Sequence, residues 1–216
     1  MLGALQLAFI DSVNLLLIGV IVAVGIVARN NYARTTALLI AGDWCGVAGL
    51  ALIMLVIFDG LGPVVQRFVE GPVFGVLLIA TGILTAILAL RGGDNQALTQ
   101  RIMRTLHTPG PATVATGVVL GLIQSATSMP FYGGLALLSA AGIDAQVRYA
   151  AIPLYATVAL SLPTLAALAV GWVRAKPHSA AARGFDWARA HPDQITAAAT
   201  WAVAVLLIVL GVTHMV

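Results

Sequence analysis

Six long apolar stretches constrain what this chain can fold into more than any other feature of its sequence. An α-helix rises about 1.5 Å per residue and the hydrocarbon layer of a bilayer is about 30 Å thick, so about 20 apolar residues can cross it. Only 9% of the residues are charged, too few to cover a water-facing surface. We therefore predict an all-α integral membrane protein with six transmembrane helices and almost no soluble part. The stretches are 2–28, 35–58, 71–90, 112–141, 149–173 and 194–214.

The basic residues predict how these helices are oriented. Nine of the 11 lysine and arginine residues fall in the first, third and fifth connections, and the other two, Arg67 and Arg148, fall in the second and fourth. Short loops rich in lysine and arginine remain in the cytoplasm. We expect a multi-pass protein of the inner (cytoplasmic) membrane with both termini outside. The dispersal of basic residues among loops also argues against a nucleic-acid partner.

The chain divides into two halves of three apolar stretches each. The Ile-Asp-Ser sequence that ends at Ser12 aligns with the Ile-Gln-Ser sequence that ends at Ser125, an offset of 113 residues, and polar Asn14 then falls opposite polar Thr127. Because each half has an odd number of spans, the second half is inverted relative to the first. Paired inverted repeats with polar interruptions in corresponding helices are typical of the midplane sites of secondary transporters.

This repeat predicts the division of the chain. Residues 1–93 form the first three-helix repeat and residues 112–216 form the second. Residues 94–111 are expected to be a cytoplasmic amphipathic linker, because Leu98 and Ile102 recur at a spacing of four that favours a short helix on the membrane surface.

Two aspartates are the only charged residues that fall inside the predicted spans. Asp11 lies in the first stretch and Asp43 in the second, and the spans hold no basic residue to pair with them. An unpaired carboxylate at the centre of a bilayer costs about 2.5–3.5 kcal/mol even on lenient insertion scales. We expect both residues to face a polar cavity or a translocation path, where each binds a proton or a cation. The alternative is a structural role, with each carboxylate hydrogen-bonded to its neighbours.

Uncharged polar side chains accompany these aspartates, and the densest group lies in the fourth stretch. A proline removes a backbone donor and paired glycines permit a sharp bend, so we expect a helix break at Pro130, Gly133 and Gly134. A broken helix at membrane depth is tolerated where its freed groups line a cavity. The residues predicted to line a substrate or ion path are Asp11, Ser12, Asn14, Asp43, Gln124, Ser125, Thr127, Ser128, Tyr132 and Tyr155.

The sequence offers no support for several other kinds of function. His107, His178, His191 and His214 fall in loops or at the C-terminus and are not clustered, so we predict no metal site. The spans contain no Walker-type loop and no Ser/His/Asp group, so we predict no enzyme activity, no catalytic residue and no cofactor. The single cysteine, Cys45, excludes an internal disulfide.

Together, these features resemble the LysE superfamily of exporters, and within it the glycolipid-addressing group, also called GAP or Sap proteins. The resemblance covers nearly the whole chain in layout. It implies six helices in two inverted repeats and export toward the cell envelope, with a lipid-linked or amphiphilic cargo. The stretches that carry the resemblance are 8–14, the basic loop 29–34 with the following segment 39–44, and the end of the last helix at 209–212.

The chain departs from other families of that superfamily at two positions. Families that bind divalent metals often have a second acid in the fourth helix, where this chain has Gln124. Amino-acid exporters often have a proline after the asparagine-like position, where Leu15 follows Asn14. Both departures weigh against those cargoes.

Three functions therefore stay open from the sequence. The first is a secondary transporter for a lipid-linked or amphiphilic envelope cargo, coupled through the intramembrane carboxylates. The second is a divalent cation or amino-acid exporter that uses the same two aspartates. The third is a non-transporting membrane subunit of an envelope-biosynthesis complex. The expected partners are membrane lipid, a lipid-linked or small-molecule substrate, a proton or cation, and a second copy of the chain in a homodimer.

Overall fold

Every regular element that the structure describes is an α-helix. The computed structural model describes residues 2–27, 31–91, 109–176, 179, 183–184, 186–187 and 190–215. The helices are α1 (Leu2–Asp11), α2 (Leu15–Val27), α3 (Tyr32–Glu70), α4 (Pro72–Arg91), α6 (Pro111–Ala126), α7 (Met129–Ser139), α8 (Ala145–Ala150), α9 (Ile152–Ala159), α10 (Ser161–Ala175) and α12 (Pro192–Met215).

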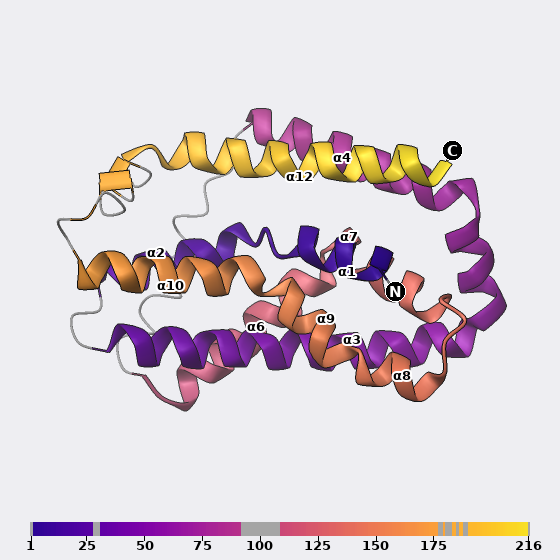
Figure 1. Ribbon diagram of the computed structural model, residues 1–216, viewed down its shortest axis with the longest axis horizontal. Coiled ribbons are helices and arrows are strands. Elements are labelled where there is room, and N and C mark those ends of the chain that lie inside the picture. The colour runs from indigo at the N-terminus through magenta and orange to yellow at the C-terminus, as the bar shows by residue number, and fades with distance from the viewer. Residues whose placement is uncertain are drawn as a thin grey trace.

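Most of these helices run roughly along the long axis of the molecule and pack in pairs that are distant in sequence. The first and last parts of the chain are interleaved, since α12 lies against α4, α2 lies against α10, and α3 lies against α6 (Figure 1). Helix α7 packs between α1 and α3. The predicted linker at 94–111 lies almost entirely outside the described residues.

The helices are long and apolar enough for a multi-pass membrane protein. Within the described residues, the segment Tyr32–Phe68 of α3 could cross a membrane alone. Three bent pairs could each cross as one broken span: α1 with α2 (49°), α6 with α7 (76°), and α8–α9 with α10 (42°). The segments Pro72–Thr81 and Ala204–Thr213 are shorter apolar helices.

The outer surface is apolar, as a lipid-facing surface must be. Ile53, Val64 and Leu168 are 58%, 65% and 66% exposed, and such side chains are expected outside when the solvent is lipid. The all-helical fold is thus confirmed, and each predicted apolar stretch falls on one helix or one bent pair. The number of crossings and the inverted arrangement of the halves stay predictions.

Helix α3 extends well beyond the predicted span. Residues 59–70 were expected to form a loop, but α3 continues through them to Glu70 and changes direction at Gly62. Gly62 has a φ of 21°, a conformation that glycine adopts without steric cost. Pro63 follows, and proline is well suited to the first turn of the resumed helix because its missing N–H would have no partner there.

Four glycines let α3 and α6 approach closely. A Cβ atom on Gly42 would collide with the carbonyl oxygen of Val114, and one on Gly117 would collide with the carbonyl oxygen of Leu39. Gly46 and Gly121 meet the facing backbone in the same way one turn further along. Small residues at such a contact allow two backbones to touch, as in other membrane helix pairs. This contact fixes the register of α3 against α6.

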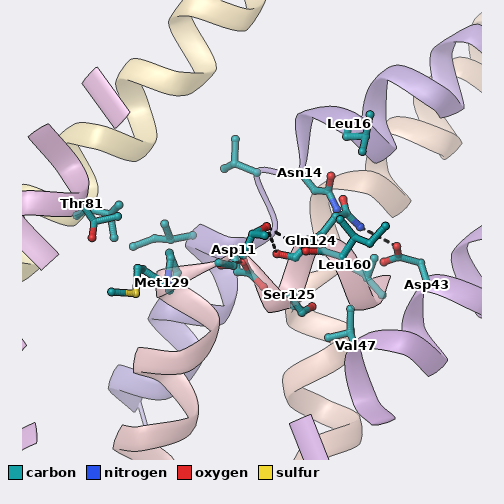
Figure 2. Close-up of a pocket in the computed structure, with 18 residues that line it drawn as sticks. Asp11, Asn14, Leu16, Asp43, Val47, Thr81, Gln124, Ser125, Met129 and Leu160 are labelled. Atoms are coloured by element: carbon teal, nitrogen blue, oxygen red, sulfur yellow. Dashed lines mark hydrogen bonds between the residues drawn. The ribbon is translucent and has the colours of Figure 1, made fainter. Parts of the chain in front are cut away.

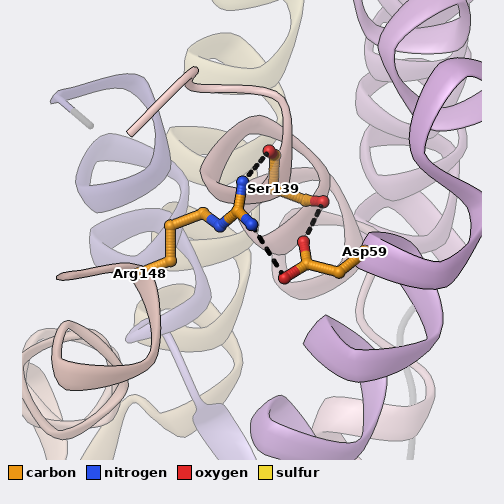
Figure 3. Close-up of polar contacts among 3 residues, drawn as sticks. All are labelled: Asp59, Ser139 and Arg148. Carbon is orange, nitrogen blue, oxygen red and sulfur yellow. Dashed lines mark hydrogen bonds and ion pairs between the residues drawn. The ribbon is translucent and has the colours of Figure 1, made fainter. Parts of the chain in front are cut away.

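An ion pair joins three helices at one end of the molecule. The Nη2 atom of Arg148, on α8, lies 3.0 Å from Oδ2 of Asp59, on α3. Ser139, at the end of α7, donates its hydroxyl to Oδ1 of Asp59 at 2.6 Å, and its carbonyl oxygen accepts from Nη1 of Arg148 at 3.0 Å (Figure 3). The side chains of Asp59 and Arg148 are each 18% exposed, so the pair is partly shielded from water.

Replacing Asp59 with alanine is expected to destabilise the protein by about 1–3 kcal/mol, because the half-buried Arg148 guanidinium would lose its charged partner. A thermal unfolding curve of the purified protein in detergent measures this loss. The double variant Asp59→Ala/Arg148→Ala should recover part of it, since no charge is then left alone. If the double variant instead loses the sum of the losses of Asp59→Ala and Arg148→Ala, the two residues do not act as a pair.

Candidate functional site

Two breaks between consecutive helices lie near one another, and at each break polar side chains form hydrogen bonds with backbone groups. Helix α1 ends at Asp11 and α2 begins at Leu15. Between them, Ser12 donates its hydroxyl to the carbonyl oxygen of Phe9 at 2.5 Å, and Oδ1 of Asn14 accepts from the amide of Leu17 at 3.0 Å. Side-chain caps of this kind replace the hydrogen bonds that a helix end lacks.

The second break separates α6 from α7 at Thr127 and Ser128. The Ser128 hydroxyl accepts from the amide of Phe131 at 3.2 Å and so caps α7. The Tyr132 hydroxyl donates to the carbonyl oxygen of Ala126, the last residue of α6, at 3.0 Å. These two hydrogen bonds give partners to backbone groups on both sides of the break.

This break lies before the residues that were expected to cause it. Pro130 occupies the first turn of α7, where proline fits a helix without loss of a hydrogen bond. Gly133 and Gly134 lie inside α7 and are buried. A Cβ atom on Gly133 would press on Leu7 and Phe74, and one on Gly134 would press on Tyr155, so both glycines allow close packing rather than a bend.

A polar cavity of about 400 Å³ lies between the two breaks (Figure 2). Its walls come from α1, α2 and the turn between them, α3, α4, α6, α7 and the turn between them, the junction of α9 with α10, and α12. The polar or charged side chains that line it are Asp11, Asn14, Asp43, Thr81, Gln124, Ser125, Thr127 and Ser128. Seven of these eight were predicted from the sequence.

The two aspartates lie on opposite parts of this cavity and each has one polar partner from the second half of the chain. Ser128 donates its hydroxyl to Oδ1 of Asp11. Gln124 donates from Nε2 to Oδ1 of Asp43 at 2.8 Å (Figure 2). Asp43 is completely buried. The close approach of α3 to α6 through Gly42 and Gly117 is what brings Asp43 within reach of Gln124.

The pair formed by Asp43 and Gln124 is incomplete. Oδ2 of Asp43 and Oε1 of Gln124 are buried, and neither has a hydrogen-bond partner in the described structure. Buried polar atoms almost always have a partner, so unpartnered ones mark a place for a ligand, a proton or a solvent molecule. Both atoms are acceptors. The site therefore calls for a hydroxyl, an ammonium group, a proton on the carboxylate, or a cation.

Three predicted path residues lie near the cavity without lining it. Ser12 is buried and turned toward the backbone of α1. Tyr155 is buried behind α7, where its hydroxyl donates to the carbonyl oxygen of Phe131 at 3.1 Å. Tyr132 lines an adjacent apolar cavity instead.

The sequence did not point to Thr81, Met129, Leu160 or Leu207 as lining residues. Thr81 is one of two threonines in an apolar stretch, and its hydrogen bond to the carbonyl oxygen of Leu77 at 2.8 Å is common for threonine in helices. Only the packing of α4 against the broken helices brings it to the cavity. No local pattern marks these positions.

The charged residues that line the cavity are both acidic. None of the described lining residues is basic, whereas two are aspartates. Within the described parts of the chain, no group of three or more His, Cys, Asp or Glu residues is placed to hold a metal ion. The cavity is thus suited to neutral hydroxyl-bearing or cationic groups and disfavours an isolated anion.

A family model described as SfLAP, "Sap, sulfolipid-1-addressing protein", matches residues 5–213. The chain belongs to this family. The resemblance to the Sap group is therefore confirmed, and it extends over nearly the whole chain, including both breaks and the cavity between them. SfLAP is not a known enzyme family. Comparison with curated proteins and with solved structures gives no match.

Proposed function

We propose that this SfLAP protein is a secondary transporter, an exporter of the LysE type, that moves a lipid-linked or amphiphilic envelope cargo. The observation that carries the proposal is the polar cavity between the two interrupted helices, with Asp11 and Asp43 on its walls. The family description names the addressing of a sulfolipid, and we extend a lipid cargo to this chain on that basis. The proposed location is the inner membrane with both termini outside.

The two carboxylates would couple the cargo to a proton or cation. An ionised aspartate at this depth is costly unless a donor or a cation neutralises it. Cargo hydroxyls can donate to Oδ2 of Asp43 and Oε1 of Gln124, the acceptors that lack a partner. A proton on the carboxylate removes one of those acceptors, so proton binding and cargo binding would compete and drive the cycle.

The arrangement of the breaks supports an inverted repeat as part of this proposal. Helix α1 ends at Asp11 and α6 ends at Ala126. These two helix ends are 115 positions apart, which is two more than the repeat offset of 113. At the same offset Trp44 corresponds to Thr157, and Nε1 of Trp44 donates to the Thr157 hydroxyl at 3.2 Å. Residues related by a two-fold axis and lying near it are expected to touch in this way. Alternating access in repeat transporters is a rocking of one repeat against the other.

A second candidate is export of a divalent cation or of a cationic small molecule such as an amino acid. The same unpartnered oxygens favour it, together with the carboxylate of Asp11 and the side-chain oxygens of Asn14 and Thr127. Hard cations prefer six or more oxygen ligands. A third candidate, a non-transporting subunit of an envelope-biosynthesis complex, would not depend on the two carboxylates.

A complementation experiment separates the three candidates. A deletion strain carrying the double variant Asp11→Asn/Asp43→Asn is compared with the deletion strain and with wild type, after membrane accumulation of the protein is shown to be equal. Export of a lipid predicts that both mutant strains retain envelope lipid in the inner leaflet and grow normally in metal. Cation export predicts metal sensitivity in both. A double variant that restores the wild-type lipid and metal content would overturn the coupled-transport proposal in favour of a scaffold.

A further inference from the structure

A second, apolar cavity opens beside the polar one. It has a volume of about 330 Å³, within the range of small-molecule sites, and it lies between the kinked end of α3, the first half of α4, and α7. Phe58, Val65, Phe68, Phe74, Leu78 and Ala136 form much of its wall. Thr81 and Tyr132 are the polar residues of its lining, and the other lining residues are apolar.

The two cavities share two lining residues, Thr81 and Met129. In Figure 2 both residues lie on the side of Asp11 that is remote from Asp43 and Gln124. The polar cavity therefore has one end at the unpartnered acceptors and another end beside the apolar walls. Met129 is unbranched and flexible, a side chain that can give way to a ligand at such a junction.

Features of α3 and α7 keep the apolar cavity open. The turn at Gly62 redirects the end of α3, so that Val64, Val65 and Phe68 form one wall. The Phe68 and Phe74 rings meet edge to face with centroids 5.8 Å apart, which joins that wall to α4. On α7, Gly133 and Ala136 face the same space with little or no side chain.

On the basis of the proposed function, we propose that this apolar cavity is an acyl-chain subsite for the same cargo molecule whose polar part binds at Asp43 and Gln124. The cargo is then a single amphiphile with a hydroxyl-bearing head in the polar cavity and a hydrocarbon chain that passes between Thr81 and Met129. A purely polar solute would leave the apolar cavity without a role. A hydrocarbon without a head group would leave Oδ2 of Asp43 and Oε1 of Gln124 without a donor.

The physics of the bilayer predicts what each subsite contributes. Lipid tails are as apolar as the cavity wall, so a chain gains little free energy when it leaves the bilayer for the apolar cavity. Recognition therefore depends on the head group. The chain subsite keeps the hydrocarbon away from the carboxylates while the head is bound, and blocking it should prevent binding by steric exclusion.

Photolabelling in lipid nanodiscs tests this subsite. The probe is a long-chain alkyl maltoside with a diazirine at the end of its alkyl chain, and the control probe is the corresponding fatty alcohol without the sugar. The full-length protein is expected to be labelled by the maltoside on the walls from α4 and α7, including Phe74 or Met129. The fatty alcohol should label these walls at least about fivefold less.

Matched tryptophan variants show whether the chain occupies the cavity. Val64 is 65% exposed but lines the cavity, so Val64→Trp can partly fill it without disrupting the core. Leu77→Trp approaches from the α4 wall. Both variants should reduce maltoside labelling of the cavity about tenfold. The control is Val56→Trp, at a position on α3 that is 58% exposed and lies outside the cavity, and this variant should be labelled like wild type.

The outcomes distinguish this inference from the proposed function. Three results would each overturn the acyl subsite: no labelling on these walls, equal labelling by the fatty alcohol, or unchanged labelling in both cavity variants. Equal labelling by the fatty alcohol would show that the cavity is a site for bilayer lipid only. The proposed function would then still be supported if Asp11→Asn/Asp43→Asn blocked lipid export. Conversely, sugar-dependent labelling that the tryptophan variants abolish would support the subsite even if that double variant exported lipid normally.

Discussion

Replacing Gly117 with alanine is expected to remove most of the folded protein from the membrane. The added Cβ atom would collide with the carbonyl oxygen of Leu39 and lie 2.8 Å from the amide nitrogen of Asp43, so α3 and α6 would have to separate. Backbone cannot move aside as a flexible side chain can, and we expect a loss of about 3 kcal/mol. Accumulation in membranes and the apparent Tm of the detergent-solubilised protein measure the effect.

Gly49→Ala is the matched control for this variant. Gly49 lies on α3, and a Cβ atom there would meet nothing within 4 Å. The variant should accumulate like wild type or slightly better, because alanine favours a helix by about 0.5–1 kcal/mol over glycine. If Gly117→Ala were as stable as Gly49→Ala, the close contact of α3 with α6 would not be a determinant of this fold.

Replacing Asp11 with asparagine is expected to abolish gradient-driven transport while the protein stays folded. An amide has nearly the shape of a carboxylate, and its oxygen can still accept the hydroxyl of Ser128, which donates to Asp11 in the wild type. The amide cannot gain or lose a proton. Transport driven by an imposed pH gradient in proteoliposomes should therefore fall at least about tenfold, equivalent to about 1.4 kcal/mol or more in the rate-limiting barrier.

Exchange of lipid cargo between the leaflets without a gradient provides the complementary measurement. If Asp11 acts in coupling, this exchange should survive in Asp11→Asn better than the gradient-driven rate. Thr116→Val is a suitable control, because the Thr116 hydroxyl donates to the carbonyl oxygen of Ala112 within α6 and does not line the cavity. Full gradient-driven transport by Asp11→Asn would exclude Asp11 as the coupling residue.

Much of the site was predictable because membrane insertion penalises polar groups strongly and locally. Asp11 and Asp43 stand out in apolar stretches by composition alone, and the run from Gln124 to Ser128 is conspicuous for the same reason. Hydropathy also placed the helices, since length and composition decide whether a segment can cross a bilayer. It could not place the break between α1 and α2, because no proline or glycine occurs at 12–14 and the caps from Ser12 and Asn14 form only when the chain has already turned.

The role of charged residues near helix ends also depended on tertiary structure. Arg148 was expected to be a loop residue that reports topology, and Asp59 to lie just beyond a span. The structure joins them in an ion pair with Ser139, because the continued course of α3 carries Asp59 toward the end of α7. Hydropathy treats each residue by itself and cannot detect a partner 89 positions away.

The sequence by itself determined that this chain is a helical membrane protein, which segments are apolar, and which polar side chains lie among them. Each of these follows from the transfer free energy of local segments into lipid. Only the tertiary structure decided that Asp43 meets Gln124, that Tyr155 stands behind the cavity, and that an apolar cavity adjoins the polar one at Thr81 and Met129. These depend on how closely glycine-bearing helices approach one another, and that distance is set by steric contact between segments far apart in the chain.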